Sequence, residues 1–285
     1  MSKLKIGLFI NKRKEKLSLV MNILFKYFSK SEIVFLNELE FISNQFDISI
    51  DELNQFKNKH YDILIAIGGD GTTMSAIRSQ YKYNKPFLGI HIGNLGFLAE
   101  SDLDKAISSI ENLKKNNFKT QLRAVFKVSV NNNDYTAIND VVIDRGQLGR
   151  MISLDVEDRG MKVNTYEGDG LIISTANGST GYSLSAGGPI ISPDLHLFTL
   201  TPICSHSLMT RTIVLSQESK LSIKTPINQD KVKLTIDGQT MLELKQNSKI
   251  DIKIDSKKVP FILFDESNYY SKLKTKMGWY NSRNK

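Results

Sequence analysis

A carboxylate lies among glycines in the segment Gly68-Gly69-Asp70-Gly71-Thr72, the pattern in this chain with the clearest chemical meaning. An apolar run precedes the segment and an apolar-periodic stretch follows it, so it is expected to join a strand to a helix. A helix N-terminus favours anions, and glycines let backbone amides approach a phosphate. Because Asp70 would compete with that phosphate, the pattern predicts another role for its carboxylate. A kinase uses such a group as a base or hydroxyl acceptor.

The number of glycines around Asp70 distinguishes between a simple tight turn and a loop that binds a ligand. A tight turn with Asp70 or Thr72 as helix cap would account for one or two glycines. Three glycines within four residues are better explained by a backbone that approaches a ligand. The segment is neither a Walker A loop nor a Gly-x-Gly-x-x-Gly motif. We therefore predict a phosphate loop formed by Gly68, Gly69, Gly71 and Thr72.

The stretch from Asp169 to Pro193 is rich in serine, threonine and glycine. A flexible surface loop is the simplest explanation, but the apolar LIIS and PII within the run favour a segment held against a core. Hydroxyls and backbone amides on glycine turns suit phosphate or ribose binding. The run from Gly181 to Ser185 lacks the last glycine of a serine-hydrolase elbow, which excludes that nucleophile. Tyr182 could stack on a base or fill the core.

Two shorter motifs carry weaker signals. Asn139 and Asp140 lie between apolar, strand-like residues. An amide and a carboxylate at a strand end can bind ribose hydroxyls, although an Asn-Asp pair can also form a simple turn. Asp237-Gly238-Gln239 predicts a hairpin turn.

Composition narrows the classes of function. The histidines His60, His91, His196 and His206 show no metal-ligand spacing, so each is expected to be a surface or core residue. The single Cys204 cannot form an internal disulfide, which predicts a reducing cytoplasm. The net charge of +8 is spread along the chain, which favours a small anionic substrate or solubility over nucleic-acid binding. No apolar run reaches the ~18 residues of a transmembrane helix, so no membrane association is expected.

Residues 1–100 alternate between strand-like and helix-like segments, which predicts an α/β domain with a mostly parallel sheet. The near-continuous apolar run at 61–67 is typical of a strand buried on both faces. The expected strands are 5–11, 32–36, 61–67 and 86–91, and the expected helices are 17–28, 48–58 and 72–80.

The pattern of predicted secondary structure changes after residue 100. The pattern Ser-Asp-Leu-Asp at 101–104 predicts a capping box that opens a helix to about Lys115. Short β-rich segments separated by turns such as Asn-Gln-Asp-Lys follow, which predicts a β-rich, sandwich-like domain over 101–266. Helical spacing at 267–285 predicts a C-terminal helix that packs back on the first domain. The cleft between two such domains is the expected ligand site.

Together these stretches resemble the NAD kinase family in motif order, from about residue 60 to residue 240. The Gly-Gly-Asp-Gly-Thr loop alone is not specific, because phosphofructokinases and diacylglycerol-type lipid kinases carry similar loops. The combination of motifs is much more specific. The matching segments are IGGDGT, GIHIGNLGFL (89–98), IND (138–140), the glycine- and hydroxyl-rich run from Asp169, ICSHSLMTRTIVL (203–215) and DGQ (237–239).

The resemblance implies transfer of the γ-phosphoryl group of ATP to the adenosine ribose 2′-hydroxyl of NAD, which gives NADP. Asp70 would accept the hydroxyl proton, and loop amides near Gly71 would hold phosphates. A divalent metal, usually Mg²⁺, would be held mainly by the phosphates. Members are commonly dimers or tetramers. The implied NAD-binding residues are Asp70, Gly71, Asn139, Asp140, Arg150, Glu167, Asp169, Thr180, Gly181, Tyr182, Ser183, Leu184, Ser185 and Gln239.

Two alternatives remain at this point, and one departure bears on the site. A diacylglycerol-type lipid kinase would share the loop but need an apolar acceptor cleft, which the hydroxyl-rich Ser179 to Ser185 run opposes. A non-catalytic NAD(P) sensor would bind the dinucleotide without turnover.

Gly181 stands where the family usually has alanine. The choice between ATP and polyphosphate as donor, and between NAD and NADH as acceptor, is open.

Overall fold

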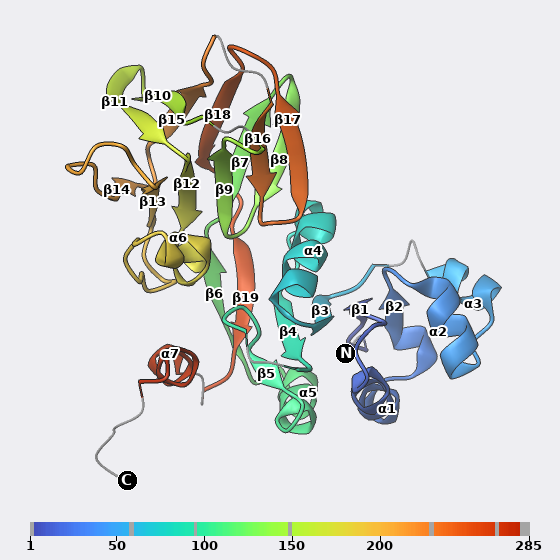
Figure 1. Ribbon diagram of the computed structural model, residues 1–285. Helices are drawn as coiled ribbons and strands as arrows, with labels where there is room; N and C mark the ends of the chain where they lie inside the picture. The colour runs from blue at the N-terminus through green and yellow to red at the C-terminus, as the bar shows by residue number, and fades with distance from the viewer. Residues whose placement is uncertain are drawn as a thin grey trace. The chain divides into compact units, whose positions relative to one another are not determined.

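The computed structural model describes residues 3–56, 60–93, 96–147, 150–227, 231–265 and 268–279 (Figure 1). Asn94 and Leu95 of the GIHIGNLGFL motif, and most of the predicted Asn-Gln-Asp-Lys turn, lie outside these residues. Contacts divide the chain into two compact units. Unit 1 comprises Met1–Leu122 and Val259–Lys285, and unit 2 comprises Arg123–Lys258.

Unit 1 is an α/β unit built on one sheet in the order β2-β1-β3-β4-β19-β6, with β5 also paired to β4. The pairs β1–β2, β1–β3, β3–β4, β4–β5 and β4–β19 are all parallel. The strands are β1 (Ile6–Ile10), β2 (Ile33–Phe35), β3 (Ile63–Gly68), β4 (Phe87–His91), β5 (Ser101–Asp102), β6 (Lys119–Arg123) and β19 (Val259–Leu263).

Helices complete unit 1. Apolar residues of α1 and α5 share one core cluster with β1, β3 and β4, so these helices cover one face of the sheet (Figure 1). The helices are α1 (Leu17–Tyr27), α2 (Leu39–Phe46), α3 (Ile50–Phe56), α4 (Asp70–Gln80), α5 (Ala106–Lys114) and α7 (Tyr269–Met277), with short 3-10 turns η1 (Lys30–Glu32) and η2 (Tyr81–Tyr83).

Strand β3 behaves as its apolar sequence predicts, since every residue from Ile63 to Gly68 is buried. The neighbouring strand β4 has a tight contact at Gly89. A Cβ there would lie 2.9 Å from the Cα of Ala99 and 3.4 Å from Thr73 Oγ1 of α4. The absence of a side chain at Gly89 therefore lets α4 and the segment after β4 pack closely on the sheet.

Several features differ from the sequence-based expectations. The predicted capping box at 101–104 is wrong, because Ser101 lies in β5 and α5 begins only at Ala106. The Asp102 carboxylate instead accepts a hydrogen bond from the Lys105 amide at 2.9 Å. Helix α2 was not predicted. The division of the chain falls after Leu122 instead of residue 100, because β5, α5 and β6 extend unit 1.

The C-terminal part of the chain returns to unit 1. Strand β19, expected in the β-rich domain, pairs in parallel with β4 through Phe261 and Phe87. Helix α7 follows in the same unit, and Lys272 donates a hydrogen bond to the carbonyl of Ala99 at 3.1 Å.

Unit 2 is built from two six-stranded antiparallel sheets. Their inward-facing residues form a single apolar cluster, so the sheets pack face to face as a sandwich. One sheet has the order β11 (Met161–Gly168), β10 (Ile152–Asp158), β15 (Lys220–Lys224), β18 (Lys249–Ile254), β7 (Phe126–Val130) and β8 (Asn133–Ala137). The other has the order β14 (Ile213–Ser216), β13 (Leu197–Ile203), β12 (Gly170–Thr175), β9 (Asp140–Asp144), β16 (Val232–Ile236) and β17 (Thr240–Leu244).

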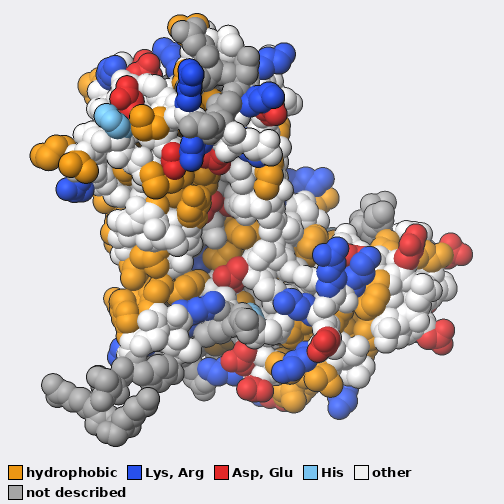
Figure 2. Space-filling view, viewed as in Figure 1, with side chains coloured by type: hydrophobic (Ala, Val, Ile, Leu, Met, Phe, Trp, Pro, Cys, Tyr) orange, Lys and Arg blue, Asp and Glu red, His pale blue; other side chains and the backbone are white. Residues whose placement is uncertain are grey.

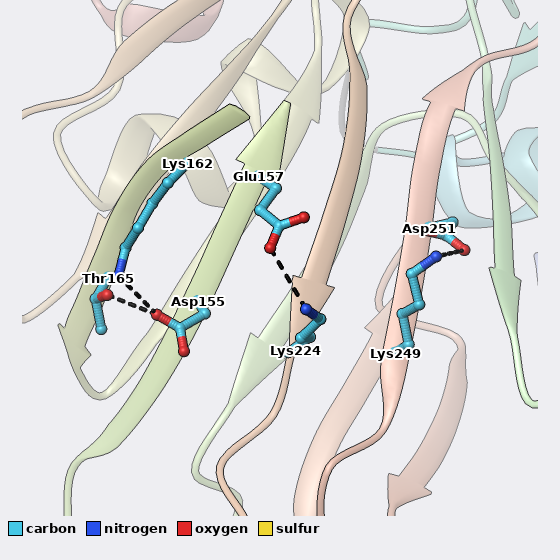
Figure 3. A network of polar contacts seen from close by, with 7 residues as sticks. All are labelled: Asp155, Glu157, Lys162, Thr165, Lys224, Lys249 and Asp251. Carbon is cyan, nitrogen blue, oxygen red and sulfur yellow. Dashed lines mark hydrogen bonds and ion pairs between the residues drawn. The ribbon is translucent and has the colours of Figure 1, made fainter. Parts of the chain in front are cut away.

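The outer face of the first sheet is polar, as strand alternation predicts. Figure 3 shows its cross-strand ion pairs, including Lys224 with Glu157 at 3.4 Å and Lys162 with Asp155 at 3.4 Å. Charged side chains of both signs also lie on both units over the face drawn in Figure 2. No helix among the described residues is long and apolar enough to cross a membrane. The predicted fold class, a mostly parallel α/β part and a β-rich sandwich-like part, is confirmed.

Candidate functional site

Strand β3 ends at Gly68, and helix α4 begins two residues later at Asp70. Gly69 is the N-cap of this helix, and the Thr73 amide bonds to the Gly69 carbonyl at 3.0 Å. No side chain caps the helix, so a capping role for Asp70 or Thr72 is excluded. The Asp70 carboxylate instead accepts hydrogen bonds from the Phe97 amide at 2.8 Å and the Leu98 amide at 3.2 Å. A distant segment of the chain therefore holds this carboxylate at the mouth of the helix.

Only some glycines near Asp70 are demanded by packing. A Cβ at Gly68 would lie 2.4 Å from Thr72 Oγ1, and one at Gly96 would lie 1.9 Å from Asp70 Oδ1. A Cβ at Gly69 would meet nothing within 4 Å. Packing thus explains Gly68 and Gly96, whereas Gly69 leaves its backbone open on the side where an anion would approach the helix.

His91 lies at the carboxyl end of β4, in register with Gly68 of β3. Its side chain is buried, and burial lowers the pKa of the imidazole. Asp70 opposes this shift, while Lys276 and Lys14 add to it. The sequence alone predicts only a surface or core residue at His91. Its position at a parallel-strand end, one strand from the glycine loop, is the signal that places it beside Asp70.

In unit 2 the two predicted ribose-binding stretches meet. The chain passes from one sheet to the other between β8 and β9, at Ile138 and Asn139. The Thr175 amide donates to the Asn139 carbonyl at 2.9 Å, and Thr175 Oγ1 donates to the Ile138 carbonyl at 2.7 Å. Asp140 pairs with Ser174 across β9 and β12. These contacts join residues 138–140, called the crossing segment below, to the start of the hydroxyl-rich run.

The hydroxyl-rich run folds as 3-10 helix η3 (Asn177–Thr180) followed by the short helix α6 (Tyr182–Ser185). Its side chains divide into two sets. Ser179 and Ser183 are fully buried, with Ser179 Oγ bonded to the Ala176 carbonyl and Ser183 Oγ 3.0 Å from Thr201 Oγ1. Tyr182 is 49% exposed, so it does not fill the core.

Two acceptors at the crossing segment lack partners. Asn139 Oδ1 is buried without a hydrogen bond. Asp140 is 7% exposed, and no donor from the described chain bonds to its carboxylate. Burial, with a smaller contribution from Asp237, raises the pKa of Asp140 to about 7. Unpaired buried acceptors of this kind fit a ligand that supplies hydroxyl donors.

The other predicted residues belong to further parts of unit 2. The pKa of Tyr182 is raised by burial and then by nearby acidic groups that include Asp144, Asp169 and Asp140. Asp169 forms an ion pair with Arg145 at 3.0 Å. Three predicted residues have exposed side chains: Glu167 in β11, Gln239 in the β16–β17 turn, and Arg150, which has no hydrogen bond or ion pair within the described residues.

Asp237 also contacts the crossing segment, although the sequence motifs assign it no role in binding. Asp237 was expected only as a hairpin turn, and the turn is present between β16 and β17. Its carboxylate is buried and accepts the amides of Ile138, Asn139 and Asp140. Nothing in the local pattern distinguishes an exposed turn aspartate from one that reaches a segment far along the chain.

No group of three or more His, Cys, Asp or Glu side chains suited to hold a metal exists among the described residues. Asp70 belongs to the glycine loop itself, and His91 is in register with Gly68 at its edge. This donor set fits a divalent ion whose main ligands are substrate phosphates, with at most a carboxylate from the protein.

Two family models match the chain. One is the ATP-NAD kinase N-terminal domain, over residues 6–118, and the other is the ATP-NAD kinase C-terminal domain, over residues 138–264. Among similar curated proteins, the NAD kinase of Clostridium beijerinckii is 38% identical over 277 residues, which is 95% of each chain. The NAD kinase of Sulfurimonas denitrificans is 41% identical over 222 residues, which is 76% of this chain and 78% of the relative.

Solved structures agree on the fold. Yeast NADH kinase complexed with NADH has a TM-score of 0.87 at 24% identity, over 99% of this chain and 89% of that chain. An NAD kinase from Archaeoglobus fulgidus in complex with ATP has a TM-score of 0.73 at 23% identity, over 98% of this chain and 100% of that chain. These likenesses concern the fold.

The glycines of the hydroxyl-rich run provide a stability test. A Cβ at Gly178 would lie 2.2 Å from the Asn139 carbonyl oxygen, whereas one at Gly181 would lie 3.2 Å from the Gly178 carbonyl oxygen. We expect Gly178→Ala to lower the free energy of unfolding by about 1–3 kcal/mol, because backbone must shift. Gly181→Ala should change it by about 0.5 kcal/mol or less. Chemical denaturation measures both, and equal losses would contradict this account.

The raised pKa of Asp140 predicts a pH-dependent stability. Between its ordinary pKa of 3.8 and its folded value of about 7, the folded chain holds a proton that the unfolded chain has lost. The free energy of unfolding should therefore fall as pH rises through this window. Asp140→Asn removes the charge, so it should raise the melting temperature at about pH 8 and change it less near pH 4. The same effect at both pH values would argue against a buried, unpaired carboxylate.

Proposed function

The chain belongs to the NAD kinase family, and we propose that it transfers the γ-phosphoryl group of ATP to the adenosine ribose 2′-hydroxyl of NAD. The observation that carries this proposal is the Asp70 carboxylate, held by two backbone amides at the N-terminus of α4. That position combines a potential proton acceptor with a helix end that favours phosphate.

We propose that Asp70 is the proton acceptor in this reaction. A bond forms between the ribose oxygen and the γ-phosphorus while the bond from that phosphorus to the leaving ADP oxygen breaks. The hydroxyl proton passes to Asp70. Its hydrogen bonds from Phe97 and Leu98 leave further lone pairs on both carboxylate oxygens, one of which can face the hydroxyl. The open backbone at Gly69 and the amides beside it would face phosphate oxygens.

Unit 2 supplies the proposed dinucleotide-binding groups. Asp140 and Asn139 present unpartnered acceptors suited to ribose hydroxyls. Tyr182 exposes a ring near Asp140 and Asp169 on which a base could stack. The remaining residues proposed to contact NAD are Gly71, Arg150, Glu167, Thr180, Gly181, Ser183, Leu184, Ser185 and Gln239. Of these, Ser183 is buried on Thr201, so its contribution would come through its backbone or through the shape of α6.

A divalent metal, Mg²⁺ by preference, would neutralise phosphate charge when bound with ATP. Asp70 is the carboxylate nearest the open helix end and would be its neighbour in the protein. The polar acceptors at Asn139 and Asp140 favour a hydroxyl-rich acceptor over the apolar acceptor of a lipid kinase. The predicted cytoplasmic location stays a prediction, supported by the free, exposed thiol of Cys204.

The Asp70→Asn variant tests the proposed base. We expect kcat for NADP formation to fall by about 10²–10⁴-fold, while KM for NAD changes little, because a base acts mainly in the transition state. The assay contains NAD, ATP and Mg²⁺ and detects NADP with an NADP-specific dehydrogenase. Removing Mg²⁺ with a chelator should abolish the signal.

Asp62→Asn is the matched control, because Asp62 is another unit 1 carboxylate that accepts a backbone amide, from Lys5 at 2.9 Å. Its kcat should equal that of wild type. Equal turnover by Asp70→Asn and wild type would rule out the base assignment. No NADP from wild type with ATP or polyphosphate, and no NADPH with NADH as acceptor, would reject the kinase reaction. NAD binding would then identify a sensor, and its absence would direct attention to lipid acceptors.

We also propose a homo-oligomer, a dimer or tetramer, assembled through unit 2. Leu208 and Met209 are 87% and 85% exposed in the loop before β14, and Val214 on this edge strand is 53% exposed. Two large apolar side chains so exposed next to a free strand edge are typical of a surface that a second copy covers.

The oligomer is tested by light scattering. The double variant Leu208→Ser, Met209→Ser should reduce the molar mass in solution relative to wild type. Leu19→Ser is the control, since Leu19 lies on α1 of unit 1 and is 52% exposed. A monomeric wild type, or a double variant with unchanged mass, would refute this interface.

A further inference from the structure

The hairpin turn between β16 and β17 contains a buried carboxylate. Asp237 and Gly238 have φ angles of 50° and 65°, and the Gln239 amide donates to the Ile236 carbonyl at 3.0 Å, so they are the central residues of a tight turn within the three-residue loop between Ile236 and Thr240. A turn aspartate of this kind ordinarily faces solvent. Asp237 is instead 5% exposed, although Gly238 beside it is exposed. Turn geometry explains the residue type but does not explain why its side chain points into the protein.

The carboxylate of Asp237 accepts three consecutive backbone amides. Its Oδ1 lies 2.7 Å from the Asn139 nitrogen, 3.0 Å from that of Ile138 and 3.2 Å from that of Asp140. The Asp237 amide donates in return to the Asp140 carbonyl at 2.9 Å. Charge-assisted bonds of this type are stronger than bonds between neutral groups, so the turn is fastened to the crossing segment in both directions.

Thr175 holds the opposite side of the same segment. It bonds to the carbonyls of Ile138 and Asn139, while Asp237 bonds to the amides of all three residues. The backbone at 138–140 therefore has partners on both sides. The Asn139 amide oxygen and the Asp140 carboxylate are left without partners in the described chain. Fixed backbone and free side-chain acceptors are the arrangement of a preorganised binding site.

We propose that Asp237 is a positioning residue for the dinucleotide, which holds residues 138–140 so that Asn139 and Asp140 meet the ribose hydroxyls of NAD. The inference rests on the proposed function. Asp237 itself would touch no substrate. Its effect would appear in NAD binding and much less in the chemical step, because it acts through the two residues whose backbone it holds.

Asp158 provides a matched control for a purely structural role. It is also a buried unit 2 carboxylate at a strand end, with 7% exposure. Its Oδ1 accepts the Lys220 amide at 2.8 Å, and its Oδ2 accepts the Ser219 hydroxyl at 2.9 Å. Asp158→Asn therefore disturbs the same kind of hydrogen bond in the same unit, at residues that no proposed NAD contact includes.

The experiment compares Asp237→Asn and Asp158→Asn in the full-length chain. It measures KM for NAD and for ATP, kcat, NAD affinity by calorimetry, and melting temperature. For Asp237→Asn we expect KM and Kd for NAD to rise about tenfold, as loss of one charge-assisted bond predicts. KM for ATP and kcat should stay within about twofold of wild type. Asp158→Asn should lower the melting temperature without changing NAD binding.

Equal NAD affinity in the two variants would overturn the proposal, as would a loss confined to stability. Amide hydrogen exchange separates this outcome from failure of the proposed function, because it needs no turnover. Exchange at residues 138–140 should be slow in wild type and faster in Asp237→Asn alone. Fast exchange in wild type would refute the role of Asp237 even if the variant failed to fold. Wild type that binds no NAD, with slow exchange intact, would reject the kinase and leave Asp237 as a structural clamp only.

Discussion

Close approach between segments of the chain is the constraint on which the Asp70 loop in unit 1 and residues 138–140 in unit 2 both depend. At Gly178 the backbone of η3 lies so near the Asn139 carbonyl that no side chain fits between them. At Gly96 the chain passes still closer to the Asp70 carboxylate. In each case a glycine lets a segment from elsewhere in the sequence approach a residue with a proposed role: the backbone of Asn139 at Gly178 and the carboxylate of Asp70 at Gly96.

The two units place their polar groups by different means. In unit 1, parallel strands end at the same edge of the sheet, so the ends of β3 and β4 bring Asp70 and His91 together. In unit 2, the chain changes sheets between β8 and β9, and the antiparallel ladders release backbone groups at that point. Thr175 and Asp237 supply the partners that the ladders no longer provide. The crossing is therefore both a topological necessity and a source of unpaired side-chain acceptors.

These acceptors lower the stability of the free protein. A carboxylate that is buried without a donor favours its protonated form, which is why the pKa of Asp140 rises to about 7. Asn139 carries a comparable cost in its unbonded amide oxygen. Hydroxyl donors from a bound ribose would satisfy both atoms. Binding and folding are thus coupled at this segment, since the ligand would supply hydrogen bonds that the protein lacks.

The sequence by itself determined the fold class, most strands of the parallel sheet, the glycine loop with its carboxylate and the family, because apolar periodicity and short glycine motifs are local properties. Local patterns misplaced the start of α5, missed α2 and assigned β19 to the wrong sheet, since strand pairing depends on distant partners. Only the tertiary structure decided three contacts. The Asp237 carboxylate accepts the amides of residues 138–140, the Ser183 hydroxyl bonds to that of Thr201, and His91 lies near Asp70. Each of these contacts joins segments whose proximity is set by the packing of sheets and not by any neighbour in sequence.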